Sequence, residues 1–311
     1  MQNETNDARK DLKSFSFSKI DTYNQCAFKY MLHYFEDDKI FAANIALELG
    51  TLIHGTEEEI ANCIKDGKPI NYKALKNNIV LKVYELEHKY PAEFKEPDKT
   101  GHTYREKIDV YLDSGIYRLE KYLKEHPELE VVATEQKFKI MYHNHQFTGS
   151  IDRVLKNKIT GEYICHDIKT WPEPHKPEEL TTPLQFVVYT LAMKELYGIV
   201  NEEVKCAYDL PFCDLIQEAG TKGYMTRGTK KLDKLFEGIE NKNWEPNPSA
   251  LCHWCPYCPT NKNQPRGAEN RCPYFCHYTK QDNKNWEKEN EWQGIENHQK
   301  VLEHWLKNKT K

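Results

Sequence analysis

Two short segments in the middle of the sequence each carry one carboxylate among apolar residues. Asp152 lies in Gly-Ser-Ile-Asp-Arg-Val and Asp167 in Cys-His-Asp-Ile-Lys-Thr, and both segments have strand character. The turn signal Lys-Ile-Thr-Gly at 158–161 joins them, so a hairpin folded there places Asp152 opposite Asp167. Two carboxylates that close repel each other unless a cation bridges them or one is protonated. Lys169 lies two residues beyond Asp167, so the two side chains point from the same face.

This set of side chains suits metal-assisted cleavage of a phosphodiester. Carboxylate oxygens are the preferred ligands of Mg²⁺ and Mn²⁺. Such an ion lowers the pKa of its bound water and neutralises charge on the scissile phosphate, while the Lys169 ammonium orients or deprotonates that water. Asp-x-Lys is a weak signal by itself, however, and an ordinary solvent-facing Asp–Lys pair explains this hairpin equally well.

Two further pairs of side chains favour the catalytic interpretation. His54 and Glu58 lie one turn apart on one face of an expected helix, where His54 offers a neutral imidazole as a third metal ligand. Gln185 and Tyr189 share a face of another expected helix, where they would order Lys169 or a DNA phosphate. Taken alone, each pair is more often structural.

The cysteines fall into two groups. Of the ten, Cys63, Cys165, Cys206 and Cys213 are scattered among apolar residues, as is typical of buried filler. The others are Cys26 near the N-terminus and a C-terminal group made up of Cys252, Cys255, Cys258, Cys272 and Cys276. The polar N-terminus lacks the features of a signal peptide, so we expect a cytoplasmic protein. In a reducing compartment, clustered cysteines favour metal binding over disulfides.

Charge and hydropathy exclude some classes of protein. The 311 residues carry a net charge of −4, which excludes a uniformly basic nucleic-acid coat, so a polyanion must meet a local patch or a metal ion. No apolar run approaches the roughly 20 residues that span a bilayer, so we expect no membrane partner. Lys222, Arg227, Lys230, Lys231 and Lys234, with Tyr224 nearby, form a basic stretch that would line a single strand or simply be a solvated helix face.

The periodicity predicts the elements that position these residues. Helices are expected after Ser16 or Ser18 and over 46–66, 71–89, 103–126, 183–197, 227–242 and about 283–307. Strands are expected over 131–141, 147–155, 163–170 and 204–210. This order predicts one α/β unit with a helical insertion in its front half.

In this order, the residues resemble the PD-(D/E)XK nuclease superfamily, and more closely its RecB-like branch with an iron–sulfur cluster. That branch includes the AddB nuclease, the CRISPR-adaptation exonuclease and many phage-encoded relatives. The resemblance runs from Ser14 to about Tyr278. The residues that carry it are Ser14 to Tyr30 with Cys26, Gly50, His54, Glu58, Glu135, Gly149, Asp152, Asp167, Lys169, Thr170, Gln185, Tyr189 and the segment from Asn247 to Tyr257.

The resemblance implies a restriction-endonuclease-like mixed sheet flanked by helices. It implies a single nuclease domain over 14–278, with a largely helical part at 45–128, the catalytic sheet and helix at 130–212 and a cysteine clasp at 250–278, followed by a helical tail at 279–311. It makes His54, Asp152 and Asp167 ligands of Mg²⁺ or Mn²⁺. Lys169 becomes the catalytic lysine, Gln185 and Tyr189 support the site, and the role of Glu135 stays open.

The same resemblance implies that one N-terminal and three C-terminal cysteines hold a [4Fe–4S] cluster. Cys26, Cys252 and Cys255 match directly, and Cys272 is favoured over Cys258 as the fourth ligand, with Cys276 a third choice. Zinc is the alternative, because Cys258, Cys272 and Cys276 with His253 or His277 would bind it.

Three functions follow from the resemblance. The first is a metal-dependent DNA exonuclease acting on single strands or DNA ends in recombination, replication or repair, with a phage or mobile-element origin and a recombination or helicase protein as partner. The second is a CRISPR-adaptation nuclease that trims spacer precursors, although the helical insertion and the tail argue against it. The third is a non-catalytic iron–sulfur protein that binds DNA ends within a larger assembly, against which the intact Asp152, Asp167 and Lys169 weigh.

Overall fold

The computed structural model describes residues 14–35, 44–97, 101–199, 204–247, 249, 251–252, 255–257 and 272. The chain divides into two compact units, one comprising residues 12–17 and 43–233 and the other 1–11, 18–42 and 234–311. The expected tail helix, Cys258 and Cys276 lie outside the described residues. Among the helices that are described, none combines the length and the apolar character needed to cross a bilayer.

The larger unit is built around a mixed sheet, which has six strands in the described part of the chain. Its order is β1-β3-β4-β5-β6, with β2 paired to β3. The β1–β3 and β4–β5 pairs are parallel and the others antiparallel. This confirms the expected mixed α/β fold. The strands are β1 (Ser14–Phe15), β2 (Leu129–Tyr142), β3 (His145–Asn157), β4 (Tyr163–Ile168), β5 (Val204–Leu210) and β6 (Leu215–Ala219).

The β3–β4 hairpin has the register that the sequence predicts. Arg153 pairs with His166 and Leu155 with Ile164, so the next position along brings Asp152 opposite Asp167. The turn lies at 158–161, where Gly161 has a φ of 77° and the Asn157 side chain accepts hydrogen bonds from the backbone N–H groups of residues 159 and 160. The hairpin therefore fixes the distance between the two strands that carry the carboxylates.

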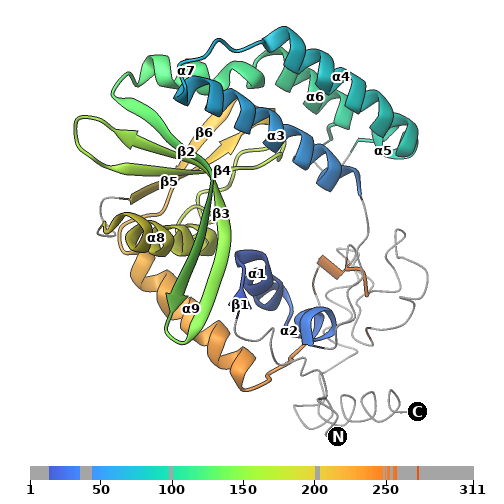
Figure 1. Cartoon of the computed structure of the whole chain (residues 1–311). Helices are drawn as coiled ribbons and strands as arrows, with labels where there is room; N and C mark the ends of the chain where they lie inside the picture. The colour runs from blue at the N-terminus through green and yellow to red at the C-terminus, as the bar shows by residue number, and fades with distance from the viewer. Residues whose placement is uncertain are drawn as a thin grey trace, which may run out of the picture. The chain divides into compact units, whose positions relative to one another are not determined.

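Helices cover both faces of this sheet (Figure 1). On one side lie α3 (Ile45–Lys65), α4 (Tyr72–Lys89), α5 (Pro91–Lys95), α6 (Tyr104–Asp113) and α7 (Arg118–Glu125), and their apolar side chains form one core with Leu129, Val131, Leu155 and Ile164 of the strands. On the other side lies α8 (Leu184–Tyr197), which ends at Gly198 with a φ of 65°, as predicted. The last helix is α9 (Tyr224–Glu240).

Two expectations about the elements are wrong in detail. The helix expected over 103–126 is broken into α6 and α7 by a 3₁₀ turn at Gly115–Tyr117, because a Cβ at position 115 would lie 2.2 Å from the backbone oxygen of Pro211 and the chain must bend there. The strand β6 was not expected from the sequence. Its five residues are only partly buried except for one exposed residue, so the segment lacks the apolar alternation of a half-buried strand.

The smaller unit joins the two ends of the described chain. Helices α1 (Phe17–Gln25) and α2 (Ala27–Tyr30) and the π-helical turn Met31–Phe35 supply Tyr23 and Tyr30. The Tyr30 ring stacks on Trp244, with their centroids 5.8 Å apart, and the Tyr23 hydroxyl donates to the Asn243 backbone oxygen over 2.8 Å. Aromatic packing thus holds segments more than 200 residues apart in the sequence.

Candidate active site

Four neighbouring strands of the larger unit place side chains in one row across the sheet. The β2–β3 register puts Glu135 opposite Asp152, and the β3–β4 register puts Asp152 opposite Asp167. In the parallel β4–β5 pair, Asp167 is the partner of Tyr208. Side chains at matching register positions leave the same face of a sheet, so three carboxylates meet next to an aromatic ring.

Asp167 is held by hydrogen bonds on one side and by an ion pair on the other. Its Oδ1 accepts from Gln185 Nε2 at 2.6 Å and from the Tyr189 hydroxyl at 3.0 Å. Its Oδ2 lies 2.7 Å from Lys169 Nζ. The role suggested by the sequence for Gln185 and Tyr189 was to order Lys169 or a phosphate, and the structure shows that they act on Asp167, which in turn holds the lysine.

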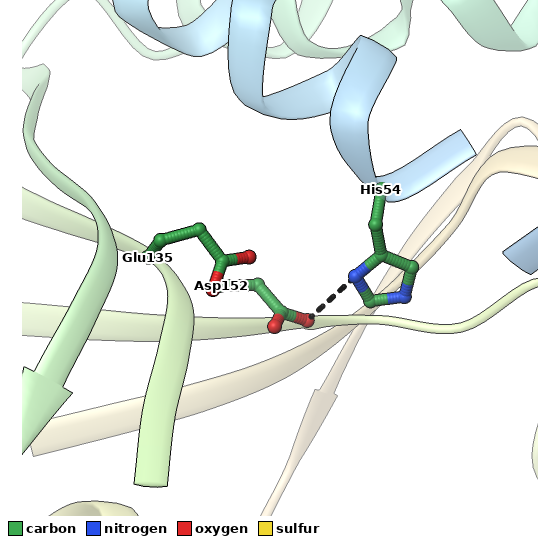
Figure 2. A group of neighbouring side chains, drawn as sticks. All are labelled: His54, Glu135 and Asp152. Carbon is green, nitrogen blue, oxygen red and sulfur yellow. Dashed lines mark ion pairs between the residues drawn. The ribbon is translucent and has the colours of Figure 1, made fainter. Parts of the chain in front are cut away.

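A second group of possible ligand atoms comes from three different elements (Figure 2). One atom each from His54 of α3, Glu135 of β2 and Asp152 of β3 lies within 4.8 Å of the others. His54 Nδ1 is 3.7 Å from Asp152 Oδ2, which also accepts from the Ile168 backbone N–H at 2.6 Å. One imidazole nitrogen and two carboxylates form a donor set that fits Mn²⁺ or Mg²⁺. Glu135, whose role the sequence left open, therefore belongs to the site.

The backbone at Glu135 is strained. Its φ is 43°, a left-handed value that residues other than glycine adopt at a cost of about 1–3 kcal/mol. The side chain accepts a hydrogen bond from the Ser150 hydroxyl at 2.8 Å, which fixes its direction beside Asp152. Strain of this kind collects at functional sites, and nothing in the local sequence announces it.

Burial and crowding change the protonation of the site. Burial, reinforced by the charge of Asp167, raises the pKa of Asp152 to about 8. Burial also lowers the pKa of His54, which keeps its imidazole neutral and able to ligate a cation. A divalent ion would therefore displace a proton from Asp152 on binding.

The site opens into a pocket along α3. His54, Glu58 and Glu135 line it together with the small residues Ala46, Gly50, Thr51 and Gly55 and with Leu47. Because Gly50 and Gly55 carry no side chain, a ligand backbone can approach α3 closely there. The pairing of His54 with Glu58 on one helical face, expected from the sequence, thus forms one wall of this pocket.

A buried ionic network behind the site was missed by the sequence analysis. Arg153 Nη1 donates to Asp209 Oδ2 at 2.7 Å and its Nη2 to Glu57 Oε2 at 3.2 Å. Arg118 binds the same two carboxylates. All four side chains are almost fully buried, so two positive charges balance two negative ones inside the protein.

This network lies next to the catalytic residues in the sequence. Arg153 follows Asp152 directly, and Glu57 is three residues after His54 on α3. The backbone oxygen of Asp209 accepts from the Lys169 N–H at 2.9 Å. We infer that the network fixes α3, β3 and β5 relative to one another and thereby sets the spacing of the site.

The network contains a histidine that we expect to make the fold sensitive to acid. Burial, together with the charge of Arg153, lowers the pKa of His166 to about 3 from its ordinary 6.5. Below pH 6.5 the unfolded chain binds a proton that the folded chain does not, so the free energy of unfolding should fall by up to about 1.4 kcal/mol per pH unit toward pH 3.

Urea denaturation at several pH values measures this effect. The pH dependence should flatten between pH 6.5 and 4 in His166→Gln, but not in the control His88→Gln, which alters an exposed histidine. An unchanged slope in His166→Gln contradicts the assignment.

The basic stretch at the start of α9 is partly committed to internal contacts. The Arg227 guanidinium donates to the backbone oxygens of Lys222 and Thr181. The Tyr224 hydroxyl is 2.6 Å from that of Thr190. Arg227 and Tyr224 therefore stabilise the loop before α9, which argues against the expectation that they contact a single strand.

Four cysteines of the smaller unit line one pocket. They are Cys26, Cys252, Cys255 and Cys272, the four favoured as cluster ligands. Two of these sulfurs accept backbone hydrogen bonds, Cys26 Sγ from Asn247 at 3.4 Å and Cys252 Sγ from Ser249 at 3.3 Å. A four-thiolate donor set with N–H groups directed at sulfur fits an iron–sulfur cluster and also fits zinc.

Comparison with known proteins gives three results. The sequence profile of the PD-(D/E)XK nuclease superfamily matches residues 14–260. The chain is 26% identical over 209 residues, 60% of its length, to an ATP-dependent helicase/deoxyribonuclease from Carboxydothermus hydrogenoformans, of whose matched chain it spans 19%. A candidate exonuclease from Eubacterium rectale, known from its crystal structure, has a TM-score of 0.45 and 11% identity, over 82% of this chain and 92% of that one.

The profile match covers the two strands of the hairpin, α3, α8 and the first cysteines of the C-terminal group. It thus includes the convergent carboxylates, histidine and lysine described above. The chain belongs to the PD-(D/E)XK nuclease superfamily and is a metal-dependent nuclease.

Proposed function

We propose that this protein is a divalent-metal-dependent DNA exonuclease that hydrolyses phosphodiester bonds on single strands or at DNA ends. The observation that carries the proposal is the meeting of Asp152, Asp167 and Lys169 with His54 and Glu135 at the mouth of one pocket. DNA as the substrate is in line with the helicase/deoxyribonuclease that the chain resembles over part of its length.

The side chains divide the work by their surroundings. His54, Asp152 and Asp167, with Glu135 added, would hold Mg²⁺ or Mn²⁺, which when bound supplies an activated water and neutralises phosphate charge. Gln185 and Tyr189 hold Asp167 Oδ1, so that its Oδ2 faces the lysine.

Lys169 then places a positive charge beside the reacting phosphate. Its backbone N–H is bound to Asp209, which anchors the start of the side chain, and its ammonium is directed by Asp167. An ammonium in this position orients the attacking water and stabilises the charge that develops on the phosphate oxygens.

We further propose that Cys26, Cys252, Cys255 and Cys272 hold a [4Fe–4S] cluster. What supports this is that all four line one pocket although Cys26 is more than 200 residues away from the others in the sequence. A cluster there would close a long loop and pin the N-terminal helix to the C-terminal segment. A recombination or helicase protein as partner stays a prediction.

The test of the nuclease is degradation of end-labelled DNA by the full chain in Mn²⁺ or Mg²⁺. We expect labelled single strands to be degraded, EDTA to stop the reaction, and Asp167→Asn to be inactive while its circular dichroism spectrum is unchanged. Blocking the 5′ or the 3′ end of the substrate reports the polarity of digestion. If the wild-type protein binds labelled ends but cleaves nothing in either metal, the protein is a non-catalytic DNA-end-binding component.

A further inference from the structure

An aromatic stack lies beside the catalytic lysine and has no part in the chemistry described so far. It starts with Trp171, two residues after Lys169, whose side chain is 46% exposed. The Trp171 ring centroid is 4.3 Å from that of His175, and the His175 ring stacks on Tyr208 at 4.0 Å with an interplanar angle of 27°. His175 and Tyr208 are buried, so the stack offers solvent the indole at its end.

The stack rises from the same sheet face as the catalytic carboxylate. Tyr208 is the register partner of Asp167 in the parallel β4–β5 pair. Both residues contact α8, Asp167 through Gln185 and Tyr208 through Phe186, whose ring centroid is 4.5 Å away. The segment from Lys169 to Trp171 also passes close to α3, since a Cβ at Gly50 would lie 3.6 Å from the Thr170 hydroxyl.

Hydrogen bonds hold the loop that carries the stack. The His175 N–H donates to Gln217 Oε1 at 2.9 Å, and Gln217 Nε2 donates back to the His175 backbone oxygen at 3.0 Å. The Trp171 backbone oxygen accepts from Cys213 Sγ at 3.5 Å. The indole is therefore supported from behind and held at both ends of the turn, which lowers the entropy cost of binding a ligand on its exposed side.

We propose that Trp171 stacks an unpaired base of the nucleic-acid strand whose phosphate lies at the catalytic centre. This proposal rests on the nuclease function proposed above and names the feature of the substrate that the site selects. A planar base binds an aromatic ring through its π-face regardless of sequence. In a duplex both faces of a base are covered by neighbouring pairs, so only a single strand or a frayed end can use the indole.

The test compares binding of two oligonucleotides with the same phosphates. One is fluorescein-labelled oligo-dT and the other is the same strand with abasic sites, both measured at one fixed salt concentration in EDTA so that neither is cleaved. We expect Trp171→Ala to bind oligo-dT about 10- to 100-fold more weakly than the wild type. Its affinity for the abasic strand should be unchanged, and Trp171→Phe should retain most of the affinity for oligo-dT.

Tyr84→Ala is the matched control, because Tyr84 is a 62% exposed aromatic residue on α4. It should bind both strands as the wild type does. Equal affinity of wild type and Trp171→Ala for oligo-dT overturns the proposal, as does an equal loss for both strands. Cleavage is scored separately in Mn²⁺: a wild type that binds oligo-dT through Trp171 but does not cleave it refutes the nuclease function and leaves the stacking site standing.

Discussion

Replacing Lys169 by methionine is expected to lower the rate of DNA cleavage by roughly 10²–10³-fold, the loss typical when one preorganised donor is removed from a charged transition state. Methionine keeps the length and the apolar stem of the side chain but removes the ammonium that lies 2.7 Å from Asp167 Oδ2. The affinity for the strand should change far less, because the phosphates outside the site are still bound. The rate is measured under single-turnover conditions with excess protein.

The matched control is Lys205→Met on the neighbouring strand β5. The Lys205 side chain is 50% exposed and forms a surface ion pair with Glu162 at 3.2 Å, a type of contact worth little in stability or catalysis. Its cleavage rate should equal that of the wild type. Full activity in Lys169→Met, or an equal loss in both variants, contradicts the catalytic role of Lys169.

Much of the site could be predicted because a hairpin obeys simple arithmetic. Once the turn at 158–161 is recognised, a register with Asp152 opposite Asp167 follows, and the alternation of a strand puts Lys169 beside Asp167. Helical spacing likewise placed Gln185 and Tyr189 on one face of α8, where both reach the same carboxylate oxygen. Local periodicity was sufficient for these residues because each contact lies within one hairpin or one helix.

The parts that could not be predicted depend on contacts between distant elements. The Arg118, Arg153, Glu57 and Asp209 network draws one side chain from each of four elements, and a charged residue in a sequence is normally read as exposed. The left-handed backbone of Glu135 is another such feature, since only the strand opposite it explains the strain. The break in the helix expected over 103–126 has the same origin, because Pro211 packs against Gly115.

The network and the site together explain how a chain of net charge −4 can hold a polyanion. The buried arginines are neutralised by Glu57 and Asp209 and so leave little field at the surface. The carboxylates at the site would repel a phosphate unless a divalent ion were bound between them. Attraction of the substrate then depends on the metal and on base stacking, and binding to bases is less sensitive to salt than binding to phosphates alone.

Replacing Cys272 by serine is expected to remove most of the iron from the protein, whereas replacing Cys258 is not. Anaerobically purified wild-type protein should be brown and contain about four iron atoms per chain, as a cluster with four thiolate ligands requires. Cys272 lines the same pocket as Cys26, Cys252 and Cys255, and its backbone N–H donates to Tyr257, a fully buried residue of that pocket, at 3.2 Å. Serine has nearly the same shape but is a poor ligand for iron, so the change tests ligation rather than packing.

Iron, zinc and visible absorbance are measured for the wild type, Cys272→Ser and Cys258→Ser purified side by side, with circular dichroism as the check on folding. Cys258 lies outside the described residues and is the matched control, because it is the other candidate for the fourth ligand. Loss of iron in Cys258→Ser but not in Cys272→Ser would exchange their roles. A colourless wild type with stoichiometric zinc would replace the cluster by a zinc site built from the same thiolates. The Tyr30–Trp244 stack does not depend on any metal, so we expect the Cys272 variant to keep its two chain ends packed together after the iron is lost.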